Sequence, residues 1–274
     1  MTRQLNPLCY LLALLACTMT MAVSAKEMCG DDDDDDDELP LSVAEIYAEL
    51  NHTDGDLGIH GLIDGDAWKR LTILDPYERR MARVNVTGRL RRQGLTELFF
   101  ESAEPPFDEL SPKAFFARFP EGCYEVEAKS LENEELEGET FFSHIMPAPP
   151  ANLAVNGYPA ALDCDEYVPV IEADYYTLSW DPVTTHHPYI GKHGDVEIVQ
   201  YQAVVEFETE DEHGEEVVYV YNVELPPEVT SVTVPPEFMA LGDEFKYELV
   251  VREGYHNQTA LESCFRTSEE EEED

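Results

Sequence analysis

The chain has 274 residues, of which 59 are Asp or Glu and 17 are Lys or Arg, so its formal charge is −42 at pH 7. A surface this negative repels phosphate backbones and anionic lipid headgroups, which argues against nucleic acid as a partner and favours cations or a basic molecule. Much of the excess negative charge is spread through the folded region, which indicates a solvated acidic surface.

Residues 1–25 are typical of a secretory signal peptide. The apolar run Leu8–Ala16 precedes the small residues Val23–Ala25, so we expect cleavage before Lys26. The run is shorter than the roughly 20 residues of a spanning helix, so no membrane insertion is expected after cleavage. A retained anchor and lipidation at Cys17 stay open as alternatives. The sequence predicts a secreted, periplasmic or cell-surface protein.

An unbroken run of Asp31–Asp37 marks residues 26–40 as a disordered acidic tether, because repelling charges without apolar partners cannot pack. A weak calcium-binding role for this run is the alternative interpretation. Residues 269–274 form a similar acidic tail.

Residues 41–146 show short apolar or alternating runs separated by turn signals, which predicts a β-sandwich domain. A short helix is expected from Pro112, capped by Ser111 and stopped by Pro120. The expected strands are Val43–Leu50, Leu57–Ile63, Trp68–Leu74, Met81–Val86, Glu97–Ser102, Cys123–Lys129 and Thr140–Ile145.

The proline-rich segment Met146–Pro150 predicts a hinge before a second domain, residues 151–268. Asp211–Glu216 reads as an acidic hairpin turn within it. We therefore expect an all-β fold with two β-sandwich domains in tandem after the signal peptide and tether. The expected strands are Val168–Ile171, Tyr176–Trp180, Val199–Phe207, Val217–Val223, Ser231–Val234, Phe245–Val251 and Ala260–Thr267.

Four segments of the second domain resemble a fibronectin type III domain: Leu178–Pro182, Ile198–Val204, Thr230–Val234 and Gly242–Leu249. The chain departs from the pattern at Phe245, where the family has the tyrosine of its corner motif. The resemblance implies a binding or spacer module rather than a catalyst, although a fold alone names no function. The first domain resembles no family of known activity.

Four cysteines remain after signal cleavage, which allows three disulfide connectivities in an oxidising compartment. Cys164 and Cys264 lie near the two ends of the second domain and are the preferred pair. Cys29 is expected to stay free or to pair with Cys123.

Two Asp-Gly-Asp segments provide the candidate calcium ligands Asp54, Asp56, Asp64 and Asp66. If Leu57–Ile63 is extended, the two pairs lie about 20 Å apart, so one ion cannot join them. Asp-Gly is also the usual dipeptide of tight turns, and we expect turns at both places.

The loop Thr184–Asp195 contains His186, His187 and His193, which could bind a transition metal. Because neighbouring side chains in extended backbone point apart, we expect a solvated loop. It is also the best candidate for a specific contact, since binding residues concentrate in loops on a rigid scaffold.

No nucleophile, metalloprotease or phosphate-loop motif is present, so no catalytic residue and no cofactor is assigned. The sequence predicts a secreted non-enzymatic binding or spacer protein with an extracellular protein or glycan partner. The alternatives are a calcium-dependent adhesion or matrix protein and a hydrolase with its site in the first domain. Glycosylation sequons begin at Asn51, Asn85 and Asn257.

Overall fold

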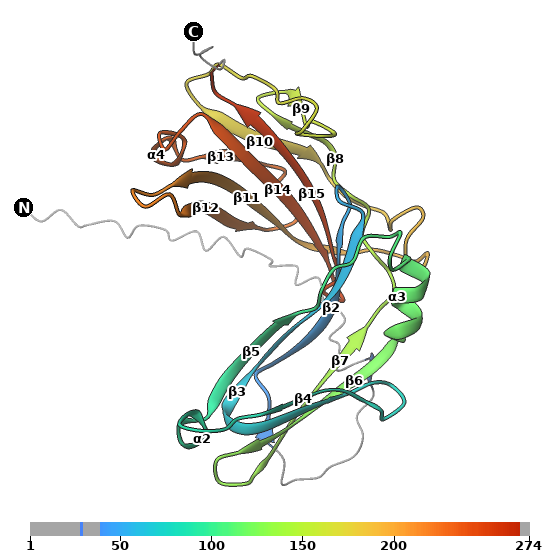
Figure 1. Ribbon diagram of the computed structural model, residues 1–274. Coiled ribbons are helices and arrows are strands. Elements are labelled where there is room, and N and C mark those ends of the chain that lie inside the picture. The colour runs from blue at the N-terminus through green and yellow to red at the C-terminus, as the bar shows by residue number, and fades with distance from the viewer. Residues whose placement is uncertain (1–27, 30–38, 269–274) are drawn as a thin grey trace, which may run out of the picture.

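The computed structural model describes residues 28–29 and 39–268, and these are mostly strands. Figure 1 shows two lobes, each surrounding its own hydrophobic cluster. An eleven-stranded sheet runs through both lobes, and a four-stranded sheet completes the second lobe. The predicted all-β class with sandwich architecture is confirmed. The predicted signal peptide, nearly all of the tether and the acidic tail lie outside the described residues.

Within residues 39–146, the first lobe contains seven strands and two short helices. Its strands are β1 (Leu39–Pro40), β2 (Val43–Asn51), β3 (Asp56–Leu74), β4 (Arg80–Asn85), β5 (Leu95–Glu101), β6 (Gly122–Ser130) and β7 (Glu135–Phe142), and its helices are α2 (Leu90–Gln93) and α3 (Pro112–Arg118). Most strands lie where the sequence predicted them. The last one is displaced, because β7 begins at Glu135 and ends at Phe142, before Ile145.

The long strand β3 organises the first lobe. Its first half pairs with β2 and β5, and its second half pairs with β6 and β4. The expected turn at Asp64–Asp66 is wrong, since β3 continues through it. Register shifts flank Trp68, so the strand bends there and folds the sheet over this fully buried indole. Gly65 leaves room at the bend for Leu41, which a β-carbon at 65 would approach within 2.7 Å.

The predicted helix is confirmed as α3. The Ser111 side chain caps it by accepting a 3.4 Å hydrogen bond from the Ala114 N–H, and Pro112 occupies the first turn. Phe115 is its buried residue. After the helix, the Tyr124 hydroxyl donates to the Pro120 carbonyl at 3.0 Å, which fixes the entry of β6 in the manner of a tyrosine corner.

The second lobe is a sandwich of two sheets with the order β13-β10-β8-β9 on one side and β15-β14-β11-β12 on the other. The Tyr201 hydroxyl accepts from the Val183 N–H inside its core, beside the ring of Trp180. The elements are β8 (Ala151–Val155), β9 (Tyr158–Pro159), β10 (Tyr176–Asp181), β11 (Ile198–Glu210), β12 (Glu216–Leu225), β13 (Ser231–Val234), α4 (Pro236–Met239), β14 (Glu244–Glu253) and β15 (Gln258–Arg266).

One strand prediction in the second lobe is wrong. Val168–Ile171 is not a strand and touches β15 only through an isolated bridge from Val170 to Arg266. Pro169 has no N–H to donate to a ladder, so the segment cannot form a regular one. The first strand of the lobe is instead β8, which lies next to β10.

The two lobes share one sheet because β15 pairs in parallel with β2, with Gln258 opposite Glu49 (Figure 1). The predicted hinge Met146–Pro150 is held at the same place. Met146 is fully buried and its carbonyl accepts from the His187 N–H, while the Pro147 carbonyl accepts from the Thr259 hydroxyl.

Both disulfides connect distant parts of the chain. Cys164 pairs with Cys264 across 6.0 Å between α-carbons, which confirms the preferred pair. Cys29 pairs with Cys123 across 5.5 Å, one of the two outcomes expected for it. Disulfides of this kind are typical of proteins that fold in an oxidising compartment. In residues 28–29 and 39–268, no helix has the length and apolar character needed to span a membrane.

Candidate binding face across the two lobes

The outward side of the shared sheet collects carboxylates from both lobes. On β2, Ile46, Ala48 and Leu50 pack into the first core, so the alternating residues Tyr47 and Glu49 point to the opposite side. The same alternation on β14 buries its neighbours in the second core and turns Lys246, Glu248 and Arg252 outward. We call the following seven carboxylates of this side the acidic face: Glu49, Asp54, Asp56, Glu104, Glu206, Glu248 and Glu262.

Strand registers place the acidic residues of the second lobe close together. Glu248 on β14 lies opposite Glu262 on β15, and Glu206 on β11 lies opposite Lys246. The Asn51 amide, on β2 of the first lobe, donates to the Glu262 carboxylate at 2.6 Å. The carboxylates of the two lobes therefore meet across the β2–β15 junction.

Glu104 reaches this face because Gly58 has no side chain. A β-carbon at position 58 would lie 2.0 Å from the Glu104 Oε1. Over that glycine, the Glu104 carboxylate extends to the His60 imidazole at 3.0 Å. His60 is buried, and although burial opposes its protonation, the hydrogen bond with Glu104 and the charge of Glu49 raise its pKa.

The crowding shifts the acidic groups toward their protonated forms. The pKa of Glu248 is raised to about 8, first by burial and then by the charges of Glu49 and Glu262. The pKa of Asp56 is raised to about 6 by burial and by Glu104. Burial also raises the pKa of Glu49 and of Glu262. The Asp56 Oδ1 atom is buried and has no hydrogen-bond partner among the described residues. The face thus holds more carboxylate than it can ionise freely near neutral pH.

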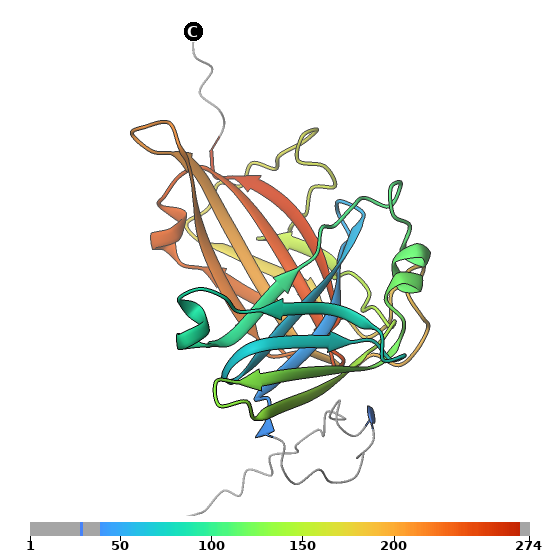
Figure 2. The same ribbon diagram turned by 60° about the horizontal axis from the view of Figure 1, so that its bottom comes forward.

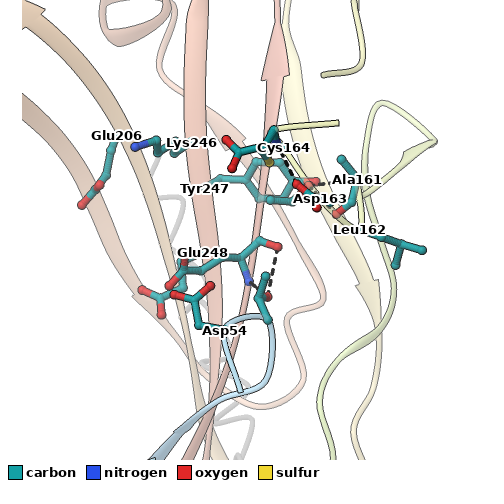
Figure 3. A pocket seen from close by; sticks show the side chains of 13 residues that line it. Asp54, Ala161, Leu162, Asp163, Cys164, Glu206, Lys246, Tyr247 and Glu248 are labelled. Carbon is teal, nitrogen blue, oxygen red and sulfur yellow. Dashed lines mark hydrogen bonds between the residues drawn. The ribbon is translucent and has the colours of Figure 1, made fainter. Parts of the chain in front are cut away.

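A pocket of about 520 Å³ opens on the second-lobe part of the acidic face (Figure 3). Its floor includes Glu206, Glu248 and Glu262, and the turn with Asp54 forms one wall. The segment Ala161–Asp165 forms the other wall, where the Cys164–Cys264 disulfide and a 2.8 Å hydrogen bond from the Ala161 N–H to the Ser263 hydroxyl hold it. Among the described residues that line the pocket, Lys246 is the single basic one.

A cationic group already binds the first-lobe edge of this face. The Arg252 guanidinium from β14 lies 5.2 Å above the Tyr47 ring and makes a 2.5 Å ion pair with Glu45. His256 lies 3.8 Å from the same carboxylate. These contacts show how the sheet accommodates a guanidinium, with an aromatic face below it and a carboxylate beside it.

The four predicted calcium ligands do not lie together. Asp54 and Asp56 belong to the acidic face, in the turn between β2 and β3 and at the first residue of β3. Asp64 lies roughly 26 Å further along β3 at about 3.3 Å per residue, where its carboxylate is 3.4 Å from the Ser42 hydroxyl. Asp66 is exposed at the bend. No three ligating side chains of the described residues are arranged to hold a metal ion.

The expectation of a solvated histidine loop is wrong for His187, which is 3% exposed. Its Nδ1 accepts from the Ile190 N–H at 3.0 Å, and its Nε2 lies 3.4 Å from His52 Nδ1 of the first lobe. Burial and the neighbouring His52 lower the pKa of His187 to about 4. The loop thus reaches across to the first lobe at His187, whereas Tyr189 at its tip is 91% accessible and His193 is exposed.

The sequons differ in accessibility. Asn85 is exposed at the end of β4. The Asn51 amide is bonded to Glu262, and Asn257 is 0% exposed. A glycan could therefore reach Asn85 in the folded protein, whereas Asn257 is enclosed.

Sequence reasoning missed most of the acidic face. Glu49, Glu206, Glu248 and Glu262 sit in alternating strand patterns that indicate ordinary solvent-facing positions. The pairing of β11, β14 and β15 brings the three second-lobe residues together, and the pairing of β15 with β2, between residues about 200 positions apart, adds Glu49.

No family model matches the chain, and no curated protein matches it. Among solved structures, a 1.5-MDa bacterial ice-binding adhesin aligns over 84% of this chain and 65% of its own at 13% identity, with a TM-score of 0.21. The ligand-binding domain of human OSCAR aligns over 81% of this chain and 97% of its own at 8% identity, with a TM-score of 0.26. The BSP domain of a biofilm-associated protein aligns over 92% of this chain and 36% of its own at 12% identity, with a TM-score of 0.24. Likenesses this weak carry no argument about function, so the fold assignment rests on the strand pairing described above.

Proposed function

We propose that the protein is a secreted, non-enzymatic binding protein whose acidic face receives a cationic extracellular partner. The observation that carries this proposal is that carboxylates of both lobes converge on one side of a continuous sheet, beside a pocket. A binding surface built on a sheet shared by two lobes is rigid, which lowers the entropic cost of association.

Electrostatics favours a cation at this face. Burial raises the pKa values of Glu49, Glu248 and Glu262, and the charges of neighbouring carboxylates raise them further. A bound cation would relieve the repulsion between these charges. Binding would then displace protons from the face. Proton release on binding is therefore a signature that separates this site from any ordinary acidic patch on the surface.

The strand order of the second lobe supports the proposal that it is a fibronectin type III-like module. Its three-stranded core β13-β10-β8 faces the four strands β15-β14-β11-β12. Trp180 and Tyr201 contact each other in the core, as the resemblance implies. This lobe would present the pocket, and the first lobe would extend the acidic face beyond it.

Calorimetric titration with an octalysine peptide, in two buffers of different ionisation enthalpy, tests the proposal. We expect binding with proton release, weakened about tenfold or more in Glu49→Gln/Glu248→Gln. Glu237→Gln, an exposed residue of α4 outside the face, is the matched control. Equal binding by the two variants would reject the acidic face as the site.

A calcium titration of the same proteins tests the ligand expectation for Asp54 and Asp56. If the melting temperature rises with calcium but not with magnesium, and does not rise in Asp54→Asn, the cation that the face binds is a metal ion. If calcium leaves the melting temperature unchanged, the expected partner is a basic peptide or a polyamine.

A further inference from the structure

A cluster of arginines interrupts the acidic surface in the first lobe. Residues 67–96 contain eight Lys or Arg against two Asp or Glu, in a chain that is otherwise strongly negative. Six exposed members make no ion pair within the part of the chain that the structure describes. We call them the arginine end: Arg70, Arg80, Arg83, Arg89, Arg91 and Arg92.

The arginine end surrounds an open sheet edge. Arg70 is paired with Asn85 across β3 and β4, and Arg83 is paired with Thr72, so Arg70 and Arg83 are diagonal neighbours on one side of the sheet. Strand β4 pairs with β3 alone, which leaves its other edge unpaired within the described residues. Arg80 is the first residue of β4, Arg89 is the N-cap of α2, and Arg91 and Arg92 lie within that helix. Figure 2 shows the helix next to the strands of this lobe.

The second lobe carries the complementary surface. The hairpin between β11 and β12 has six exposed acidic residues, which we call the acidic hairpin: Glu208, Glu210, Asp211, Glu212, Glu215 and Glu216. Strand β12 is the last strand of its sheet, and its exposed apolar residues Val218, Tyr219 and Val220 are 44%, 46% and 52% accessible. Long apolar edge strands are templates for pairing with another chain.

The two surfaces cannot meet within one molecule. Following the sheet, six strand spacings of about 4.8 Å separate β12 from β4, or roughly 29 Å. Figures 1 and 2 both show the hairpin and α2 well apart, in different lobes. Within one molecule the two complementary surfaces are therefore kept apart, and a second copy can bring them together.

We propose that the acidic hairpin and β12 edge of one molecule dock on the arginine end and β4 edge of a second copy. The two strand edges supply unpaired backbone groups that can hydrogen-bond to each other. The arginines supply positive charge for ion pairs with the carboxylates of the hairpin. Each contact uses the hairpin surface of one copy and the arginine end of another, which leaves the second surface of each copy open, so the contact is head-to-tail and builds rings or open chains.

The net charge sets the conditions for this assembly. At about 0.01 M salt the Debye length is about 30 Å, so the repulsion between two molecules of charge −42 opposes their approach. At about 0.15 M it falls to about 8 Å, which screens the distant charges and spares close Arg–carboxylate pairs. At about 1 M the close pairs are screened too. Self-association should therefore be strongest at intermediate salt. By contrast, the affinity of the arginine end for a separate polyanion would only fall as the salt concentration rises.

Sedimentation velocity of the mature chain Lys26–Asp274, over a range of protein concentrations at these three salt levels, tests the proposal. Charge reversal in Arg80→Glu/Arg83→Glu, or in Glu212→Lys/Glu215→Lys, should weaken self-association about tenfold or more. Mixing the two reversed variants should restore it, because each then carries the surface complementary to the other. Lys113→Glu/Arg118→Glu on α3 makes the same charge change outside the arginine end and should self-associate like the unmodified protein.

Several results would overturn the proposal. The unmodified protein could stay monomeric at every salt level, or the mixture of reversed variants could fail to associate while circular dichroism shows both folded. If removal of residues 269–274 abolished assembly while Glu212→Lys/Glu215→Lys still assembled, the acidic tail and not the hairpin would bind the arginine end. Binding of heparin to the arginine end without self-association would make a polyanion the partner. The octalysine titration tests the acidic face independently of self-association, because Glu212 and Glu215 lie outside that face.

Discussion

The side-chain carbonyl of Asn257 accepts a 2.8 Å hydrogen bond from the backbone N–H of Ala48, a residue 209 positions earlier. Its amide nitrogen donates to the carbonyls of Ser143 and Ile145 at 3.0 and 2.9 Å. One buried amide thus connects β2, the segment after β7 and the turn before β15. The two lobes are joined by this network and by a shared sheet, which fixes the geometry of the acidic face.

Replacement of this amide is expected to destabilise the whole protein. Asn257→Ala leaves one buried donor and two buried acceptors without partners, which should lower the free energy of unfolding by about 3 kcal/mol. Urea denaturation measures the change. Asn85→Ala, at an exposed sequon, should change it by less than about 0.5 kcal/mol. Similar small values for both variants would contradict the role assigned to Asn257.

Protonation of His187 should weaken the contact between the lobes. Its pKa in the folded protein is about 4, below the ordinary value of 6.5, so the unfolded chain binds the proton more readily. The stability it contributes is complete above about pH 6.5 and is lost as pH falls toward 4, by up to about 3 kcal/mol. His187→Asn keeps an acceptor near the Nδ1 position but does not titrate, so its unfolding free energy should vary less over this range. His186→Asn serves as the control, and an identical pH profile in all three proteins would refute the assignment.

Glu248 should have the opposite dependence on pH. Its folded pKa of about 8 exceeds the ordinary value of 4.5, so stability is complete below about pH 4.5 and falls as pH rises through 8. Glu248→Gln should therefore be more stable than the unmodified protein at pH 8, by on the order of 1–2 kcal/mol after allowance for its partial exposure to solvent. The two proteins should converge near pH 4. Thermal unfolding at pH 4 and at pH 8 measures the stability difference between the two proteins at each end of this range. If Glu248→Gln were less stable than the unmodified protein at pH 8, the Glu248 carboxylate would not be destabilised by burial and by its acidic neighbours.

Gly58 should control the ionisation of His60. Gly58→Ala places a methyl group where the Glu104 carboxylate lies, so Glu104 must leave His60. The pKa of His60 should then fall, because the hydrogen bond that raises it is lost while burial remains. Proton NMR titration of the imidazole should give the same direction for Glu104→Gln. If Gly58→Ala left the His60 titration unchanged, the contact between Glu104 and His60 would not be the cause.

Removal of the Cys164–Cys264 disulfide should act on stability and on the pocket wall. The bond closes a loop with a sequence separation of 100, for which chain entropy predicts a loss of about 4.7 kcal/mol in Cys164→Ala/Cys264→Ala. The segment Ala161–Asp165 would also lose one of its attachments to β15. Denaturant unfolding and limited proteolysis at Leu162, which is 97% exposed, measure the two effects. Unchanged cleavage at that segment would indicate that the hydrogen bond from Ala161 to Ser263 is sufficient to hold it.

Local patterns in the sequence determined most of the strands, the α3 helix and the all-β class. Ser111-Pro112 specifies a helix start by its own chemistry, and the alternation in Phe245–Val251 specifies a strand with one buried face, because both signals depend on neighbours within a few residues. Such signals become ambiguous where a short segment such as Asp-Gly is compatible with both a turn and a strand. Asp64-Gly65-Asp66 has the composition of a turn, yet it continues β3, since burial of Trp68 and contact with Leu41 favour a bent strand.

Only the tertiary structure decided the surfaces that carry the proposals. The acidic face exists because β15 pairs with β2, the burial of His187 because its loop reaches His52, and the separation of Arg83 from Glu212 because the shared sheet fixes the distance between the lobes. Each of these relationships joins residues more than 100 positions apart. The free energy of such contacts depends on which surfaces meet, and the residue pattern of one segment does not contain that information.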